Sequence, residues 1–435
     1  MNPEELNVKT LGECRYDSPL TRVAAGWNFD FIDDDRRVLM DITTQPRPDR
    51  VGLSFEQAGP RRKTFFDTAD SKAAVLTAGG LCPGLNDVLR ALVMELHHWY
   101  GVRHVYGVRY GYLGLTRDTR WPPHVLTQEE ISDIHVHGGS ILGSSRGRRD
   151  AGEMADTLER LGVNMLFTIG GDGTTRGAHD LALEIERRGK PISVVSIPKT
   201  IDNDIEMVFR SFGFQTAVGE AMRTINCAHA ESKGAPSCVA IVKLMGRETG
   251  SIAANATLAS GDVNYCLIPE LPFPLEGGNG LLEHLRRRLR DRNHAVIAVA
   301  EGAGQHLIGT SGERDASGNV KFNDVGLFLK DAIVKAFKGW GEEVNIKYFD
   351  PGYMIRALPA NSADSIFCSD LAQHAVHAAM AGKTDVMIGL WHGMFTHIPM
   401  GAVVGKKRRI DPKGNLWRAV LSTTGQPAGW GMEAQ

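Results

Sequence analysis

Long hydrophobic runs, paired cysteines and an excess of charge of one sign are all missing from this sequence. No apolar run approaches the roughly 18 residues of a membrane span, and the amino terminus lacks the pattern of a signal peptide, so we expect a cytoplasmic protein with no membrane partner. The six cysteines stand singly, never as Cys-x-x-Cys, which argues against a zinc knuckle and a disulfide framework. The net charge of -2 gives no positive field that would attract nucleic acid. Any anionic ligand must therefore be held by a local site.

The composition that is present is that of a globular protein. Of the 435 residues, 42% are hydrophobic and 23% are charged, far from the composition of disordered chains. This length allows about two to four domains. Residues 1–70, interrupted by prolines, arginines and an acidic run, are expected to form an amino-terminal extension that covers a neighbouring surface. We divide the rest into residues 71–210, residues 211–398 and a tail of residues 399–435.

From Lys72 onward, short apolar stretches end in glycine-rich turns and amphipathic helices follow. This alternation predicts an α/β fold with doubly wound parallel sheets, in which ligands lie beyond the carboxyl ends of the strands. Asn86 is expected to cap one helix, and a stripe of leucines between residues 281 and 289 marks another. The expected strands cover residues 73–77, 164–169, 192–197, 239–244 and 295–300.

Two basic segments raise the question of nucleic-acid binding. Residues 286–292 carry five arginines on the face opposite the leucine stripe, without interleaved aromatic residues, and residues 406–409 read Lys-Lys-Arg-Arg. We interpret both as solvated faces and expect no nucleic-acid partner.

Residues 168–177, Thr-Ile-Gly-Gly-Asp-Gly-Thr-Thr-Arg-Gly, predict a phosphate-binding turn between a strand and a helix. Glycines let backbone N–H groups approach a phosphate, and the amino terminus of the next helix adds partial positive charge. Asp172 would face the phosphates, which is favourable if it holds magnesium; a tight turn with Asp172 as a turn former is the alternative. The two threonines that follow are able to cap the helix. A second glycine turn, residues 77–84, suggests an extended polyphosphate ligand.

Residues 198–204, Pro-Lys-Thr-Ile-Asp-Asn-Asp, follow another expected strand. Phosphoryl transfer to an alcohol needs a carboxylate to accept the hydroxyl proton and cations to stabilise the transferred group. Asp202 and Asp204 are candidates for the first role and Lys199 for the second. On an extended loop residues two apart share a side, so like-charge repulsion would separate the roles of the two aspartates. A helix-capping loop with solvated acids is the alternative.

Further charged residues follow strands later in the chain. Lys243 and Arg247 end one strand, where an arginine can clamp a phosphate through two hydrogen bonds, although a surface arginine is the alternative. Glu301 follows the next strand, and Lys347 and Arg356 flank the segment Phe-Asp-Pro-Gly-Tyr. One carboxylate and two further cations suit a polar substrate that carries hydroxyls and a phosphate.

These motifs, in this order over roughly residues 72–420, resemble the 6-phosphofructokinase family, and residues 244–247 and 346–356 are similar to its long form in plants and trypanosomatids. The resemblance implies two Rossmann-like domains with the active site in the cleft between them. Residues 71–210 would bind nucleotide and magnesium, and residues 211–398, with the chain crossing back near their end, the sugar phosphate. It also implies transfer of a phosphoryl group from ATP to fructose 6-phosphate with Mg2+, and a homo-oligomer, either dimer or tetramer.

The resemblance further implies roles for single residues. Asp202 would remove the proton from the sugar 1-hydroxyl, and Asp172 would carry magnesium. The catalytic group implied is Asp202, Thr200, Arg247, Lys199 and Asp204. The residues implied for ATP are Gly80, Arg146, Gly147, Gly171, Asp172, Gly173 and Thr174. Those implied for the sugar phosphate are Thr200, Ile201, Asp202, Lys243, Met245, Gly246, Arg247, Glu301, Lys347, Tyr353, Met354, Ile355 and Arg356, with Lys347 indicating a site completed by a neighbouring subunit.

The sequence departs from the short bacterial relatives at Leu81, Cys238 and Tyr353, where those relatives have aspartate, arginine and histidine. Lys243 is a candidate to replace the charge of the missing arginine. The effector-binding arginines of the short enzymes cannot be placed, so their allosteric behaviour does not carry over.

Gly173 favours ATP as the donor, because pyrophosphate-using relatives carry an aspartate there that would fill the space of an inner phosphate. Lys199 resembles the pyrophosphate users, but also ATP-using long relatives, so a pyrophosphate-dependent enzyme is the alternative. Lipid and NAD kinases share the Gly-Gly-Asp-Gly turn without the later motifs. A catalytically silent regulatory subunit is the more remote alternative, since every catalytic position is filled.

Overall fold

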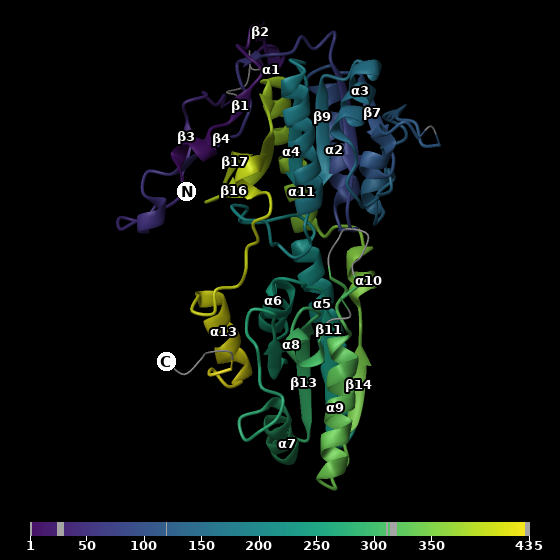
Figure 1. Cartoon of the computed structure of the whole chain (residues 1–435), viewed down its shortest axis with the longest axis vertical. Helices are drawn as coiled ribbons and strands as arrows, with labels where there is room; N and C mark the ends of the chain where they lie inside the picture. Colours follow the sequence, from purple (N-terminus) through teal and green to yellow (C-terminus); the bar gives the residue numbers. More distant parts are fainter. Residues whose placement is uncertain (1, 24–29, 119, 310–311, 314–319, 431–435) are drawn as a thin grey trace. The chain divides into compact units, whose positions relative to one another are not determined.

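The computed structural model divides the chain into two compact units (Figure 1). Unit 1 holds residues 1–213 and 357–406, and unit 2 holds residues 214–356 and 407–435. Residues 1–70 thus group with unit 1. Residues 357–398, the end of the segment in which the chain is expected from the sequence to cross back, also lie in unit 1. The structure describes residues 2–23, 30–118, 120–309, 312–313 and 320–430.

Unit 1 is built on a mixed sheet, to which the described residues contribute nine strands. The five central strands are parallel, and antiparallel strands flank them at both edges. In sheet order the strands are β3 (Arg37–Leu39), β4 (Ser54–Gln57), β17 (Met394–Pro399), β16 (Val386–Trp391), β10 (Ser193–Pro198), β9 (Met165–Gly170), β6 (Lys72–Thr77), β7 (His104–Val108) and β8 (His124–Val125). The predicted parallel α/β core is confirmed.

The predicted strands β6, β9 and β10 lie side by side in this sheet. Thr77 pairs with Ile169, and Gly170 pairs with Pro198. Every residue of β9 and β10 is buried, as expected for parallel strands that are covered on both faces. Because parallel strands end at the same edge, both glycine turns and the loop after β10 leave the sheet together.

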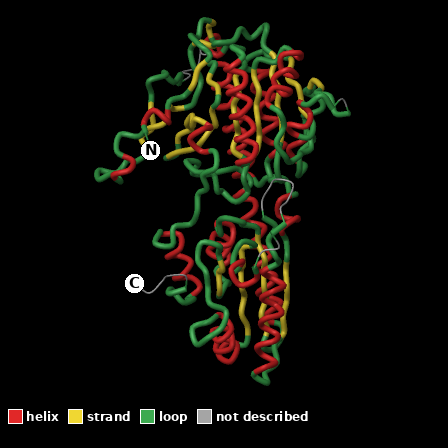
Figure 2. Tube along the Cα trace, viewed as in Figure 1, coloured by secondary structure: helices red, strands yellow, loops and turns green. Residues whose placement is uncertain are grey.

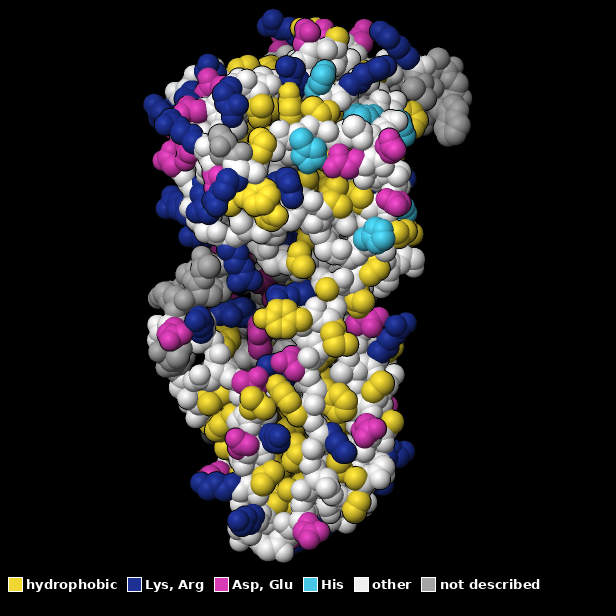
Figure 3. All heavy atoms as spheres, turned by 90° about the vertical axis from the view of Figure 1, so that its right-hand side faces the viewer, with side chains coloured by type: hydrophobic (Ala, Val, Ile, Leu, Met, Phe, Trp, Pro, Cys, Tyr) yellow, Lys and Arg dark blue, Asp and Glu magenta, His cyan; other side chains and the backbone are white. Residues whose placement is uncertain are grey.

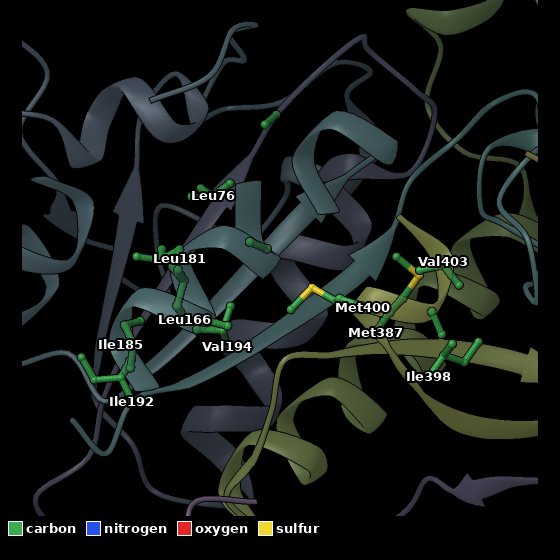
Figure 4. Packing of buried hydrophobic residues seen from close by; sticks show 14 of the residues in the cluster. Leu76, Leu166, Leu181, Ile185, Ile192, Val194, Met387, Ile398, Met400 and Val403 are labelled. Atoms are coloured by element: carbon green, nitrogen blue, oxygen red, sulfur yellow. The ribbon is translucent and has the colours of Figure 1, made fainter. Parts of the chain in front are cut away.

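Helices cover this sheet (Figure 2). Leu181 and Ile185 of α4 pack against Leu166 of β9 and Val194 of β10, as Figure 4 shows. Helices α2 and α11 pack against each other, and α11 also contacts β10 and β16. The helices of unit 1 are α1 (Leu20–Val23), α2 (Leu85–His98), α3 (Ala151–Leu161), α4 (Asp172–Arg187), α11 (Ser362–Met380) and α12 (Met400–Val403), with short 3-10 helices at Pro3–Leu6, Pro48–Arg50, Gly111–Leu115 and Ile134–Val136.

The amino-terminal extension contributes strands to unit 1 and does not merely cover a surface. Strands β3 and β4 pair with each other, and β4 pairs with β17. Phe55 of β4 is fully buried, and its ring meets that of Trp391 edge to face at 5.7 Å. The shorter strands of the extension pair as β1 (Lys9–Thr10) with β15 (Lys383–Thr384) and β2 (Tyr16–Asp17) with β5 (Lys63–Thr64).

Unit 2 contains a parallel sheet of four strands within the described residues. In order they are β12 (Tyr265–Leu267), β13 (His294–Ala300), β11 (Cys238–Leu244) and β14 (Asn345–Phe349). Its helices are α5 (Phe214–Lys233), α6 (Ser251–Ser260), α7 (Leu281–Arg292), α8 (Gln305–Ile308), α9 (Val325–Gly339), α10 (Gly352–Arg356) and α13 (Asn415–Thr424). The two strands predicted here, residues 239–244 and 295–300, are confirmed as β11 and β13 to within one residue.

Helix α7 has the amphipathic character that its sequence predicts. Its four leucines are buried. Arg286 Nε and Arg290 Nη2 both donate to Glu342 Oε1, at 2.9 and 2.5 Å, and Arg288 Nε donates to the carbonyl of His294. These three arginines therefore have partners within unit 2. In the part of the chain that the structure describes, no helix is both long enough and apolar enough to cross a membrane.

Candidate active site

The predicted phosphate cradle of unit 1 lies where β9 ends and α4 begins. Gly171 occupies the position before the helix, and α4 starts at Asp172. A Cβ at Gly170 would lie 2.1 Å from Thr174 Oγ1, so only glycine allows this close turn. The prediction that a threonine caps the helix is wrong: Thr174 and Thr175 lie inside its first turn, and Thr175 Oγ1 donates to the carbonyl of Gly171 at 3.2 Å. No described side chain caps α4, so its amino terminus offers backbone N–H groups of the kind that bind a phosphate.

Asp172, the candidate metal ligand, is the first residue of α4 and is partly exposed. Its Oδ1 accepts a hydrogen bond from the backbone N–H of Gly405 at 2.9 Å, and its Oδ2 lies 3.6 Å from Arg176 Nη2. No group of three or more His, Cys, Asp or Glu side chains that could hold a metal occurs among the described residues. A single carboxylate beside a phosphate cradle fits magnesium, which prefers one or two carboxylates together with phosphate oxygens and water.

The second glycine turn joins the same edge of the sheet. Gly79 has a φ of 87°, and its N–H donates to the carbonyl of Ser145 at 3.2 Å. Ser144 Oγ donates back to the carbonyl of Gly79. This pairing brings the segment that continues into Arg146 and Gly147 against the turn. The roles of both serines could not be predicted from the sequence, because nothing in the spacing indicates a partner about 65 residues earlier.

The helix after this turn begins differently from the prediction. Gly84, with a φ of 98°, holds the capping position, and Asn86 is buried inside the first turn of α2. The side chain of Asn86 donates to the carbonyl of His137 at 3.0 Å and accepts from the N–H of Ile141 at 3.0 Å. Asn86 therefore fastens a distant loop and does not cap the helix.

Lys199 connects the two glycine turns. Its side chain is buried, and its Nζ donates to the carbonyl of Gly80 at 2.7 Å. A Cβ at Gly79 would lie 3.1 Å from this Nζ, and one at Gly171 would lie 3.2 Å from the carbonyl oxygen of Lys199. Burial lowers the pKa of Lys199, whereas Asp202 and Asp204 act to raise it. An ammonium group thus lies between the two predicted phosphate-binding turns.

The loop after Lys199 holds its two aspartates in different environments. Thr200 Oγ1 donates to Asp204 Oδ1 at 2.5 Å, and both residues are buried. The N–H of Asp202 donates to Thr200 Oγ1 at 3.2 Å. The prediction of an extended loop is wrong, because Asn203 has a φ of 52° and turns the chain between the two aspartates.

Ser211 stabilises this turn, a role that no motif in the sequence indicates. Its Oγ donates to the carbonyl of Thr200 at 2.6 Å, and its N–H donates to Asn203 Oδ1 at 2.9 Å. The structure thus brings Gly80, Gly171–Thr174 and Lys199–Asp204 together at one edge of the unit 1 sheet.

Unit 2 carries the remaining candidates, beginning with Lys243 of β11. Lys243 Nζ contacts Asp324 Oδ2 at 2.5 Å and Asp350 Oδ2 at 2.8 Å. Although burial lowers the pKa of Lys243, these two carboxylates raise it well above its ordinary value. Tyr348 Oη also donates to Asp324. The charge of Lys243 is therefore balanced inside unit 2.

Arg247 lies beside Glu301 at the carboxyl edge of the unit 2 sheet. Its guanidinium carbon is 4.5 Å from the centre of the Phe322 ring, and its Nη2 donates to the carbonyl of Val320. Burial raises the pKa of Glu301, and the nearby Arg247 acts to lower it. The glycine between Met245 and Arg247 has a φ of 127°, and a Cβ there would lie 2.4 Å from the carbonyl oxygen of Thr249.

The candidates on β14 and α10 divide into exposed and buried residues. Tyr353 is 80% exposed and Met354 is 70% exposed, and the Arg356 guanidinium lies 4.4 Å from the centre of the Tyr353 ring. Ile355 is buried, so its side chain packs inside unit 2. Lys347 is partly exposed, with its Nζ 3.8 Å from Glu231 Oε2.

A family model described as phosphofructokinase matches residues 72–379. The chain belongs to the phosphofructokinase family. It is 46% identical over 433 residues to an ATP-dependent 6-phosphofructokinase of Borreliella burgdorferi, which covers 97% of both chains. It is 47% identical to ATP-dependent 6-phosphofructokinase 7 of Arabidopsis thaliana, over 87% of this chain and 78% of the relative. The enzyme of Trypanosoma brucei brucei is 42% identical over 97% of this chain and 87% of its own. The predicted likeness to the plant and trypanosomatid enzymes is confirmed.

Solved phosphofructokinase structures share the fold. A pyrophosphate-dependent phosphofructokinase from Marinobacter aquaeolei aligns with a TM-score of 0.65 over 81% of this chain and 91% of its own, at 20% identity. Phosphofructokinase of Pichia pastoris in the T-state aligns with a TM-score of 0.62 over 82% of this chain and 39% of its own, at 22% identity.

One expected replacement within this phosphofructokinase needs correction. Cys238 begins β11 and Lys243 stands five residues further along it, about 16 Å away at the rise of a strand. Lys347 lies on β14 opposite Ala240, and its charge acts to lower the pKa of the Cys238 thiol, which burial raises. Lys347, and not Lys243, is thus the cation near the position of the missing arginine.

Proposed function

We propose that this phosphofructokinase transfers the terminal phosphoryl group of ATP to the 1-hydroxyl of fructose 6-phosphate, giving fructose 1,6-bisphosphate and ADP. The observation that carries the proposal is the position of Lys199 Nζ, which lies over the carbonyl of Gly80 and next to the Gly171–Thr174 turn while its loop continues into Asp202. A polyphosphate held by both turns would present its terminal group to that loop.

The chemistry assigned to unit 1 follows from the surroundings of each side chain. Asp202 accepts the proton of the attacking hydroxyl as general base. Asp204 is a positioning residue, because its carboxylate accepts a hydrogen bond from Thr200 Oγ1. Thr200 Oγ1 in turn accepts a hydrogen bond from the N–H of Asp202. Lys199 stabilises negative charge on the transferred group. Magnesium, held by Asp172 and phosphate oxygens, would neutralise charge on the phosphates when bound.

Unit 2 is proposed to bind the sugar phosphate. The planar guanidinium of Arg247 is oriented by the Phe322 ring and the Val320 carbonyl, which suits two-pronged binding of a phosphate. Glu301 would accept a hydrogen bond from a sugar hydroxyl, and the backbone around Met245 and Gly246 would contact the sugar. Tyr353, which is exposed, and Arg356, which is partly exposed, offer groups of α10 for the 6-phosphate. Lys243 is proposed to act indirectly, by positioning Asp324 and Asp350, because it forms ion pairs with both carboxylates.

A homo-oligomer is proposed from the surface of unit 2. Leu327 and Val334 of α9 are 46% and 43% exposed, and Tyr353 and Met354 of α10 are more exposed still. Figure 3 shows such hydrophobic side chains among charged ones on the surface of this unit. Lys347 of β14 would then reach the sugar phosphate bound by a neighbouring subunit. Whether the oligomer is a dimer or a tetramer, and the cytoplasmic location, stay predictions.

The purified chain alone decides between the candidate functions. Turnover is measured with ATP and with pyrophosphate, each against fructose 6-phosphate and sedoheptulose 7-phosphate, with and without Mg2+. We expect magnesium-dependent turnover of fructose 6-phosphate with ATP at least tenfold more efficient than with pyrophosphate, a difference of about 1.4 kcal/mol or more. Efficient turnover with pyrophosphate would favour the alternative donor, and absence of turnover with every pair would favour a silent subunit.

A further inference from the structure

Unit 1 contains a cavity lined by several charged residues, formed by the amino-terminal extension, the turn before β15 and the start of β15. Its volume is about 410 Å³, within the range of small-molecule sites. The residues that line it are Thr10, Gly12, Glu13, Cys14, Ile32, Asp33, Asp34, Arg61, Arg62, Lys63, Ala381 and Lys383. None of them belongs to the candidate active site.

Two buried cations form the inner wall of this cavity. The side chains of Arg61 and Lys383 are only 7% and 5% exposed. Behind them lies Glu56, also buried, whose Oε1 is 3.0 Å from Arg61 Nη2 and 2.9 Å from Lys383 Nζ. One buried carboxylate therefore serves two buried cations, which leaves a positive charge to be balanced from the cavity side.

Asp34 supplies that balance from a largely exposed position. Its Oδ1 accepts from Arg61 Nε at 2.8 Å and from Lys383 Nζ at 3.0 Å, yet its side chain is 66% exposed. A carboxylate that reaches in from a surface loop is the easiest part of such a network to exchange for another anion, because it returns to water when displaced and the incoming anion then balances the buried cations in its place.

The cavity also contains a second pair of cations, which two acids balance in number. Arg62 and Lys63 add two cations, and the acids that face them are Glu13 and Asp33. The Arg62 guanidinium lies 4.9 Å from the centre of the Phe31 ring, which restricts its orientation. An arginine fork next to a lysine is the combination that recognises phosphate oxygens.

We propose that this cavity binds a small molecule through a phosphate group, which takes the place of the Asp34 carboxylate between Arg61 and Lys383. The ligand class is inorganic phosphate or a phosphate monoester. This site is separate from the proposed catalytic function and does not depend on it.

Cys14 provides a local readout of occupancy. Its thiol lines the cavity and donates to the carbonyl of Ala381 at 3.3 Å, whereas Cys227 is exposed on α5. We expect inorganic phosphate, at constant ionic strength set with chloride, to slow alkylation of Cys14 measured by peptide mass spectrometry, and to leave Cys227 unaffected. Equal rates with and without phosphate at Cys14 would overturn the proposal.

Variants at the cavity should change phosphate binding in opposite directions. Asp34→Asn removes the competing carboxylate and should tighten phosphate binding roughly tenfold, whereas Asp35→Asn, the same charge change outside the cavity, should not. Arg62→Ala should weaken binding by a similar factor, with Arg36→Ala as its matched control.

Affinity in these variants is read from the rise of Tm with phosphate concentration. Because phosphate at the active site affects each variant and its control equally, the difference between them reports on the cavity. If Asp34→Asn and Asp35→Asn respond alike to phosphate, and Arg62→Ala matches Arg36→Ala, the cations serve only to fasten the extension and the proposal fails.

Discussion

Replacing Gly173 by aspartate tests the assignment of ATP as the donor. Gly173 is the second residue of α4, its backbone is that of an ordinary helical residue, and a Cβ added to it would meet no atom within 4 Å. An aspartate side chain therefore fits without strain. At a helix amino terminus a negative charge even stabilises the fold, by about 0.3–1 kcal/mol. We expect the variant to fold as the parent does.

The effect on ATP follows from electrostatics. In our proposal the side chain of residue 173 faces an inner phosphate of ATP at about 4 Å, where two unit charges repel by about 4 kcal/mol at an effective dielectric near 20. This energy corresponds to a loss of affinity on the order of several hundred-fold, less whatever salt and the metal ion screen. Pyrophosphate has no nucleoside and no inner phosphate, so its use should suffer less.

The assay compares kcat/KM for ATP and for pyrophosphate in the parent, in Gly173→Asp and in Gly173→Asn. The asparagine variant has the same shape without the charge, so it separates repulsion from crowding. Circular dichroism establishes that all three are folded. If the folded aspartate variant keeps the ATP efficiency of the parent, the nucleotide does not bind at the amino terminus of α4 and the reasoning is refuted.

Three further predictions concern the base, the arginine clamp and pH. Asp202→Asn should lower kcat by roughly 10²–10⁴-fold with fructose 6-phosphate affinity nearly unchanged, because it removes the proton acceptor. Arg247→Ala should lower kcat/KM by roughly 10²–10³-fold, and Arg247→Lys should restore it only in part, because lysine has no planar fork to lie on the Phe322 ring. Burial raises the pKa of Glu95 to about 7, so the free energy of unfolding of the parent falls as pH rises through that value. Glutamine cannot ionise. Between pH 5 and pH 8 the free energy of unfolding, measured with urea, should therefore fall by about 3 kcal/mol less in Glu95→Gln than in the parent.

Each of these predictions has a result that contradicts it. A kcat of Asp202→Asn within about threefold of the parent would remove this residue from proton transfer. Complete rescue of Arg247→Ala by lysine would mean that a point charge is enough. If unfolding of Glu95→Gln follows the same pH dependence as the parent, Glu95 is ionised in the folded protein throughout that range.

The parallel strands and the loops that follow them could be predicted from the sequence, because both depend on local patterns. A fully apolar stretch ending in glycines indicates a buried strand and a tight turn wherever it occurs. The strands of the extension, two to four residues long, carry too little pattern to be seen; they exist because partners such as β17 and β15 arrive more than 300 residues later.

The partners of individual side chains could not be predicted for the same reason. Asp172 accepts a hydrogen bond from the N–H of Gly405, which is 233 residues away in the sequence. Lys243 pairs with Asp324, which is 81 residues away. Such contacts depend on how distant segments are placed by the sheets, and nothing in local spacing specifies them. Within one loop the difficulty was conformational: the positive φ of Asn203 separates the surroundings of Asp202 and Asp204.

The discontinuity of unit 1 has a consequence for the chain during its synthesis. Strand β10 ends at Pro198, but its neighbour β16 begins only at Val386. At roughly 5–20 residues per second, the ribosome needs about 10–40 s to supply the missing strand, and one side of β10 lacks its native partner meanwhile. The continuous stretch 214–356 holds the four strands of the unit 2 sheet that the described residues form, so that sheet can form first. Unit 1 would complete its sheet last, although its first residues leave the ribosome before all others.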